Sequence, residues 1–309
     1  MEKGINVLSL FDGISCGQLA LKRAGINVNK YYASEVDKHT IKICQHNFPN
    51  TIQLGDVTKV IAPIQIDLLL GGSPCQGFSS SGKGLNFEDP RSKLFFEFVR
   101  ILKEVQAYNP EVAFLLENVI MKKEHQDVIT KYLGVEPILI DSKFFSAQTR
   151  KRLYWTNIKF DTPSDKGIQL VDILEDCKFM NPGAIRGRNI RPAGITGRRL
   201  NEKGVRKDND KSFPIVQCLE VKDSNKSNCL TTVQKDNVLT FLEPGRYLNA
   251  FDRKEDYRHY TLIECCRLQT LPDNYFNKII TDTQALKAIG NGWTIDVISH
   301  ILKNLKWST

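Results

Sequence analysis

The first half of the chain alternates short apolar runs with amphipathic stretches, and this pattern constrains the fold more than any other feature of its 309 residues. Apolar runs of strand length cover residues 5–10, 31–36, 66–70, 113–119 and 136–141. Between them, residues 92–106 place their apolar side chains on one helical face. Because strands that alternate with helices pair in parallel, the pattern predicts an α/β fold with a doubly wound, mostly parallel sheet. Such a sheet binds its ligands at the carboxyl ends of the strands.

The alternation stops after about residue 160. Residues 183–211 hold nine basic side chains against three acidic ones. A run of this kind is either a solvated loop or a surface that follows the phosphates of a nucleic acid. Helical periodicity returns at 261–269 and 294–306. The sequence therefore predicts a catalytic and cofactor-binding domain over 1–160, a smaller insert over 161–257, and a return to the first domain over 258–309.

Composition narrows the functional class. The formal net charge of +8 favours a polyanionic partner. The eight cysteines form no CxxC pair and have no zinc-ligand spacing, so we expect no metal and reduced thiols. No apolar stretch has the roughly 20 residues that cross a bilayer, and no basic-then-apolar leader starts the chain. These features predict a soluble, cytoplasmic protein that does not bind membranes.

Three positions at predicted strand ends suit an adenosine-containing ligand. Gly13, in FDGISCG (11–17), allows a tight turn between the first strand and a helix. Glu35 ends the second strand, where a nucleotide site places an acid against ribose hydroxyls. Asp56, in GDV, could accept a hydrogen bond from an adenine amino group. The pattern G-x-G-x-x-G is absent, which disfavours NAD.

Cys75 follows the apolar run 66–70 in the stretch GGSPCQGFS (71–79). A lone cysteine is most often a small buried side chain. Here the position at a strand end, and the polar, glycine-rich stretch 76–91 that follows it, favour a nucleophile beside a mobile lid. Glu117 occupies the next strand end, where it is either an acid that donates a proton or an ion-pair partner of Arg150 or Arg152. Thiol, acid and arginines together make a nucleophile, an acid and an anchor.

In order, GGSPCQGFS, ENV (117–119) and QTRKR (148–152) resemble the carbon-5 cytosine DNA methyltransferases, which use S-adenosyl-L-methionine. FDGISCG, GDV, RHYTLIECCRLQTLP (258–272) and AIGNGWT (288–294) fall in that family's order. The resemblance spans about 5–160 and 258–305, and is nearest to the de novo animal branch and its phage or bacterial relatives. It implies a Rossmann-like methyltransferase fold with the insert as target-recognition domain, acting as a monomer on double-stranded DNA.

The resemblance also implies roles for single residues. Cys75 is similar to the thiol that attacks carbon 6 of cytosine, and Glu117 to the acid that bonds ring nitrogen 3 and the exocyclic amine. Arg152 corresponds to the residue that holds the base oxygen; the supporting residues are Arg150, Gln148 and Asn118. The target nucleotide would be flipped out of the duplex.

For the cofactor and the DNA, the resemblance implies two larger sets. The family's cofactor contacts fall on Phe11, Gly13, Ile14, Ser15, Cys16, Glu35, Val36, Asp56, Val57, Pro74, Leu94, Asn291, Gly292 and Trp293. The chain departs from the family at Ser15–Cys16, at Val36 and at Gly292–Trp293, where two glycines, tryptophan and Ser–Val are common. The candidate DNA contacts are Ser79, Lys83, Arg91, Arg198, Arg199, Thr231 and Thr232.

Three alternatives remain at this stage. A transfer-RNA cytosine-5 methyltransferase of the related branch would carry a Cys-Phe-Thr motif, which the sequence lacks. A nucleotide-dependent oxidoreductase would leave PCQ and ENV unexplained. A catalytically silent DNA-binding relative would not need Cys75, Glu117 and Arg152 together.

Overall fold

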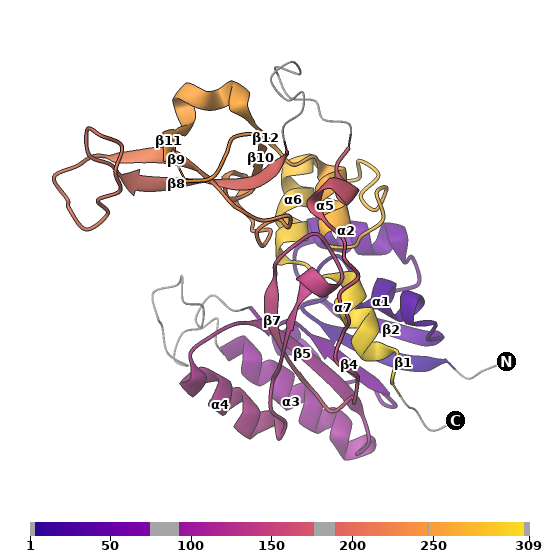
Figure 1. The fold of residues 1–309 in the computed structure, drawn as a ribbon. Coiled ribbons are helices and arrows are strands. Elements are labelled where there is room, and N and C mark those ends of the chain that lie inside the picture. The colour runs from indigo at the N-terminus through magenta and orange to yellow at the C-terminus, as the bar shows by residue number, and fades with distance from the viewer. Residues whose placement is uncertain (1–3, 75–92, 176–188, 246, 306–309) are drawn as a thin grey trace. The chain divides into compact units, whose positions relative to one another are not determined.

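A computed structural model describes residues 4–74, 93–175, 189–245 and 247–305 (Figure 1). The chain divides into two compact units. The larger unit comprises residues 1–141, 151–164 and 292–309, and the smaller unit comprises 142–150 and 165–291. The smaller unit thus includes 142–150 and 258–291 as well as most of the predicted insert, and the chain returns to the larger unit at Gly292 rather than at 258.

The larger unit contains a seven-stranded sheet in the order β3-β2-β1-β4-β5-β7-β6. All neighbouring strands from β3 to β5 pair in parallel, and β7 runs antiparallel to both β5 and β6. Its strands are β1 (Ile5–Leu10), β2 (Val28–Ser34), β3 (Ile52–Gln53), β4 (Leu68–Gly71), β5 (Ala113–Val119), β6 (Ile138–Asp141) and β7 (Lys151–Thr156). The predicted α/β fold with a mostly parallel sheet is confirmed.

The strand order reverses between β1 and β4, and this is where an open α/β sheet binds its ligands. The turns after β1 and β2 carry several of the predicted cofactor residues, and the turn after β4 carries Pro74 at the start of the Cys75 stretch. The antiparallel β7 brings a second group to the same sheet. Its register pairs Arg152 with Val119 and Tyr154 with Glu117, so that Arg152 lies diagonally across from Glu117 on one face.

Helices cover both faces of this sheet. They are α1 (Cys16–Ala24), α2 (Lys38–Asn47), α3 (Lys93–Tyr108), α4 (Lys123–Leu133) and α7 (Ile295–Leu302). The apolar side chains of α3 and α4, such as Phe98 and Ile129, pack in one core with Leu8 and Leu69. Figure 1 shows α3 and α4 side by side next to the strands, while α1 and α7 pack against each other. Both α1 and α4 end at a glycine with a left-handed backbone, which terminates a helix without strain.

The smaller unit is built on a five-stranded antiparallel sheet in the order β11-β9-β8-β10-β12. The elements of this unit are β8 (Arg191–Arg199), β9 (Ile215–Val221), β10 (Val238–Thr240), β11 (Leu248–Asn249), β12 (Tyr257–His259), α5 (Leu262–Leu268) and α6 (Asp282–Asn291). Part of the basic run is therefore strand β8 and not loop. Its alternate residues Ala193 and Ile195 pack on Leu219 and Val238 in a small core, because a strand buries every second side chain.

None of the helices in the described parts of the chain is long and apolar enough to cross a membrane.

Candidate active site

The turn after β1 is held in an unusual backbone conformation. Phe11, Gly13 and Ser15 all adopt a left-handed backbone, with φ of 58°, 58° and 59°. Only glycine adopts this conformation without cost, so the two other residues need support from their surroundings. At Ser15 that support is visible: the backbone N–H donates to the Asp12 carbonyl at 3.0 Å, and the hydroxyl donates to the Asp12 carboxylate. These bonds explain how a serine occupies a position with a left-handed backbone.

Asp12 is the centre of this turn, although the sequence did not single it out within FDGISCG. Its carboxylate is buried and also accepts the Tyr31 hydroxyl, from β2, at 2.7 Å. Burial raises the pKa of Asp12 from 3.8 to about 6, against the lowering effect of the hydrogen bonds from Ser15, Ser9 and Tyr31. The charge of Glu35 raises it further. The chain thus keeps a costly buried carboxylate to shape this turn.

Replacing Asp12 with asparagine should increase the free energy of unfolding by roughly 1–3 kcal/mol at pH 8. The folded chain binds the Asp12 proton more tightly than the unfolded chain, so the wild type loses stability as the pH rises from about 4 through about 6. Asparagine cannot ionise, yet its amide can still bond both hydroxyls. Urea unfolding of both proteins at pH 4 and pH 8 measures the effect, which should be close to zero at pH 4.

Asp56→Asn is the matched control for this experiment. The backbone N–H of Thr58 lowers the pKa of the half-buried Asp56, so ionisation of Asp56 favours the folded chain. Removing that charge should change stability in the opposite direction from Asp12→Asn. A gain of stability for Asp12→Asn that is the same at both pH values would contradict the buried charge as its cause.

Glu35 closes the same turn from the end of β2. Its carboxylate accepts the backbone N–H groups of Gly13 at 2.8 Å, Val36 at 2.7 Å and Asp37 at 2.9 Å. Three bonds leave carboxylate lone pairs for a further donor. Next to it, the Val36 side chain is 71% exposed, and no atom lies closer than 4.0 Å to the place where Gly13 would carry a Cβ. The turn therefore offers a hydrogen-bond acceptor, the Glu35 carboxylate, and the exposed apolar side chain of Val36, beside the uncrowded backbone of Gly13.

The other predicted cofactor residues lie at separate places in the fold. Phe11 and Asp56 are half-buried after β1 and β3, whereas Ile14, Cys16 and Val57 are buried. Pro74 follows β4, Leu94 lies in the first turn of α3, and Asn291 is exposed at the end of α6. Asn291 belongs to the smaller unit, and the segment from Gly292 belongs to the larger.

At the end of β5 the structure joins the predicted acid to the predicted anchor. The Arg152 Nε donates to Glu117 Oε1 at 3.0 Å, with side chains only 15% and 12% exposed. The Trp293 indole N–H donates to the other oxygen, Oε2, at 3.1 Å. Of the two possibilities left open for Glu117, the structure shows the ion-pair partner, and each carboxylate oxygen keeps a lone pair for another ligand. Arg150, the other candidate partner, bonds elsewhere.

Asn118, the next residue of β5, is buried and points to the turn after β4. Its amide donates to the Ser73 hydroxyl at 3.1 Å, and its carbonyl oxygen accepts the backbone N–H of Val119. Asn118 thereby ties the acid-bearing strand to the turn two residues before Cys75. Ser73 was not predicted, because only the fold brings it next to β5.

Gln148 and Arg150, predicted to support catalysis, are buried within the smaller unit. Arg150 donates to the carbonyls of Leu230 at 3.0 Å and Gly290 at 3.2 Å. The Gln148 side chain accepts the Leu230 N–H at 2.7 Å and donates to the Leu268 carbonyl at 3.0 Å. A Cβ on Gly290 would lie 2.6 Å from the Thr231 carbonyl oxygen, so α6 contacts this segment through bare backbone. Both side chains therefore fix the segment that leads into Thr231 and Thr232.

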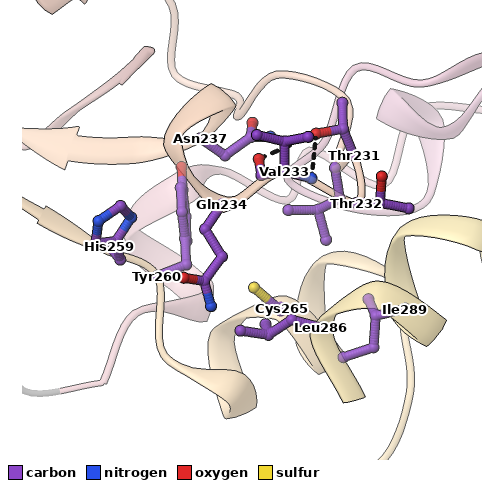
Figure 2. A pocket seen from close by; sticks show the side chains of 11 residues that line it. Thr231, Thr232, Val233, Gln234, Asn237, His259, Tyr260, Cys265, Leu286 and Ile289 are labelled. Atoms are coloured by element: carbon purple, nitrogen blue, oxygen red, sulfur yellow. Dashed lines mark hydrogen bonds between the residues drawn. The ribbon is translucent and has the colours of Figure 1, made fainter. Parts of the chain in front are cut away.

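Thr231 and Thr232 are exposed and line a small cavity of about 30 Å³ in the smaller unit (Figure 2). The Thr231 hydroxyl bonds the backbone of Val233 and the Asp236 carboxylate, which holds the turn closed. The cavity walls are the 230–234 segment, Asn237, His259, Tyr260, Cys265, Leu286 and Ile289. This volume is large enough to hold a water molecule.

The arginines predicted to contact DNA have partners inside the smaller unit. Arg198 pairs with Glu220 across β8 and β9, and lies 3.5 Å from Asp208. Arg199 donates to the backbone carbonyl of Phe213. These bonds give both side chains a structural role beyond any contact with nucleic acid. Four other predicted residues lie outside the described part of the chain: Cys75, Ser79, Lys83 and Arg91.

No group of three or more His, Cys, Asp or Glu side chains with metal-ligand geometry occurs among the residues that the structure describes.

Comparisons with known proteins agree on one family. The model of the C-5 cytosine-specific DNA methylases matches residues 5–307. The type II methyltransferase M1.ScrFI of Lactococcus lactis subsp. cremoris is 29% identical over 326 residues, which cover 97% of this chain and 77% of that protein. The type II methyltransferase M.HpaII of Haemophilus parainfluenzae is 28% identical, with 99% and 90% covered. The orphan methyltransferase M.SPRI of Bacillus phage SPR is 38% identical over 172 residues, 51% of this chain and 38% of that protein.

Solved structures show the same fold. The methyltransferase EhMeth of Entamoeba histolytica superposes with a TM-score of 0.69 at 19% identity, covering 99% of this chain and 100% of that one. The Dnmt2 methyltransferase of S. pombe gives a TM-score of 0.66 at 19% identity, with 97% of each chain covered. Together with the acid on the strand next to β4 and the arginine that pairs with it, the match over nearly the whole sequence is decisive: the chain belongs to the C-5 cytosine-specific DNA methylase family of enzymes.

Proposed function

We propose that this protein transfers a methyl group from S-adenosyl-L-methionine to carbon 5 of a cytosine that it flips out of duplex DNA, through a transient bond between Cys75 and carbon 6. The observation that supports this most is the Glu117 carboxylate, which Arg152 and Trp293 hold at the end of β5. β5 pairs directly with β4, and β4 leads to Cys75. A thiol and an acid at adjacent strand ends are the two groups that addition to a cytosine ring requires.

The proposed chemistry assigns one task to each residue. The Cys75 thiolate forms a bond to carbon 6, and the electrons of the carbon 5–carbon 6 double bond move into the ring. A proton that Glu117 shares with ring nitrogen 3 offsets this charge, and carbon 5 becomes the nucleophile. Once carbon 5 is methylated, its proton leaves to a base, and departure of the thiolate restores the double bond. Arg152 keeps the Glu117 carboxylate in place and, by the family resemblance, faces the base oxygen.

The turns after β1, β2 and β3 fit the cofactor. Glu35 retains acceptor capacity for ribose hydroxyls, Val36 and Phe11 offer apolar surface for an adenine, and Asp56 can accept from its amino group. The cofactor supplies an electrophilic methyl group on a sulfonium. The family's other contacts would come from the remaining predicted residues, Asn291 and Trp293 among them.

DNA rather than transfer RNA is the proposed substrate, because the matched family is described as DNA methylases and the sequence lacks Cys-Phe-Thr. The net charge of +8 suits a polyanion. The proposed contacts include Thr231 and Thr232, exposed on a braced turn. The proposal includes action as a monomer on DNA in a bacterial cytoplasm, as the family resemblance implies. Because its relatives include type II and orphan methyltransferases, the protein would act within restriction-modification or as an orphan enzyme.

The test incubates the protein with methyl-labelled S-adenosyl-L-methionine and either duplex DNA or transfer RNA. We expect label in DNA, recovered as 5-methylcytosine after digestion, and none in transfer RNA. Label in transfer RNA alone would favour the related branch. Binding of cofactor and DNA without transfer to either nucleic acid would show a silent DNA-binding relative and overturn the proposal.

A further inference from the structure

Trp293 makes a contact that its predicted role as a cofactor residue does not explain. Its indole N–H donates to Glu117 Oε2 at 3.1 Å, across 176 positions of sequence. The ring is only 9% exposed. The opposite oxygen, Oε1, receives the Arg152 Nε at 3.0 Å. The carboxylate therefore has one donor on each oxygen, from β7 on one side and from the segment before α7 on the other.

The indole also lies directly on the turn that follows β4. A Cβ on Gly72 would lie 2.9 Å from the indole Nε1 and 3.3 Å from two ring carbons. Only glycine allows the ring to approach this backbone so closely, because any side chain would displace it. The ring edge reaches α1 as well, 3.8 Å from the place where Gly17 would carry a Cβ. One ring thus contacts the acid, the turn three residues before Cys75, and the helix after the cofactor turn.

We propose that Trp293 is a positioning residue for methyl transfer, whose indole N–H sets the plane of the Glu117 carboxylate while its ring braces the Gly72 backbone. The inference rests on the proposed function. A carboxylate bonded through one oxygen can still rotate about its last side-chain bond. Two donors on opposite oxygens fix that rotation, and the remaining lone pairs then point in defined directions toward a ring nitrogen and an amine.

The test uses the tryptophan indole resonances and the kinetics of three variants. The chain has three tryptophans, and Trp293→Phe identifies the resonance of Trp293 in a ¹H–¹⁵N spectrum. Glu117→Gln should shift that resonance, because its acceptor loses its charge, and leave the Trp155 resonance unchanged, since that indole donates to Thr130. Trp293→Phe should lower kcat about 10- to 100-fold, the worth of a hydrogen bond to a charged group, with KM for DNA changed less than about 3-fold.

Trp155→Phe is the matched control. It removes an indole N–H from another buried tryptophan of the same unit, one that donates to Thr130 and not to Glu117. This variant should keep kcat within about 2-fold of the wild-type value. Gly72→Ala gives a second, independent disturbance of the indole and should lower kcat as Trp293→Phe does. It also keeps the test open should Trp293→Phe fold poorly.

Two results would overturn the inference: a chemical shift of the Trp293 indole N–H that does not change in Glu117→Gln, or a Trp293→Phe variant with wild-type kcat. Failure of the proposed function would look different. In that case the wild-type protein would transfer no methyl group to DNA, but the Trp293 resonance would still shift in Glu117→Gln. The contact between Trp293 and Glu117 would then be present although the proposed reaction is not.

Discussion

Cys75→Ala should lower methyl transfer to DNA by roughly 10⁴-fold or more and abolish a covalent complex with duplex DNA that contains 5-fluorocytosine. The fluorine at carbon 5 cannot leave as a proton does, so the wild-type enzyme should remain bonded to carbon 6 after the methyl group has been transferred. Without the thiol no such bond forms. Denaturing electrophoresis of protein incubated with the DNA and S-adenosyl-L-methionine measures the complex directly.

Cys229→Ala is the appropriate control. Among the cysteines in the described part of the chain, Cys229 is the one whose side chain is not buried. Its loss should leave the covalent complex intact. The buried thiols are poor competitors, because burial raises the pKa of Cys44 and Cys266 and keeps them protonated. A complex that survives Cys75→Ala and disappears with Cys229→Ala would show that Cys229, and not Cys75, is the nucleophile.

Glu264→Gln should destabilise the smaller unit by roughly 3–5 kcal/mol, the cost of removing the buried partner of the ion pair with the half-buried Arg258. The Glu264 side chain is 0% exposed and accepts both terminal nitrogens of Arg258, at 2.7 and 2.8 Å. It also accepts the backbone N–H groups of Thr261 and Glu175, at 2.9 and 3.0 Å. Four donors converge on one buried carboxylate, and glutamine can satisfy only some of them. Urea unfolding followed by circular dichroism gives the change.

Asp273→Asn provides the contrast. Its carboxylate pairs with Arg267 through two bonds, at 2.9 and 2.6 Å, but the two side chains are 47% and 33% exposed. Water screens this pair, so its loss should cost less than about 1 kcal/mol. The double variant Arg258→Gln/Glu264→Gln should recover part of the stability lost by Glu264→Gln alone. Equal losses for the buried and the exposed carboxylate would show that burial does not set the value of these pairs.

Much of the fold follows from local pattern. The runs 5–10 and 113–119 were predicted as strands and coincide with β1 and β5, because a strand buried on both faces is a short run of apolar residues wherever it occurs. The same logic predicts β2 and β4 to within a few residues. The secondary structure of the basic run was harder to predict. Its arginines alternate with glycine and small residues, and nothing local distinguishes the strand at 191–199 from a solvated loop.

The candidate site likewise combines features that follow from the local sequence with features that only the folded chain sets. Sequence alone determined the family, the approximate positions of β1, β2, β4, β5 and β6, and the presence of Glu35 and Glu117 at strand ends, since these depend on neighbours along the chain. Tertiary structure alone decided which donors each carboxylate receives: Trp293 and Arg152 for Glu117, Arg258 for Glu264, and Tyr31 for Asp12. It also placed Arg150 and Arg152, which are two residues apart, in different units: Arg150 bonds Leu230 in the smaller unit, and Arg152 bonds Glu117 in the larger. A hydrogen bond is short and directional, so its partner is fixed by the folded backbone rather than by residue type or spacing.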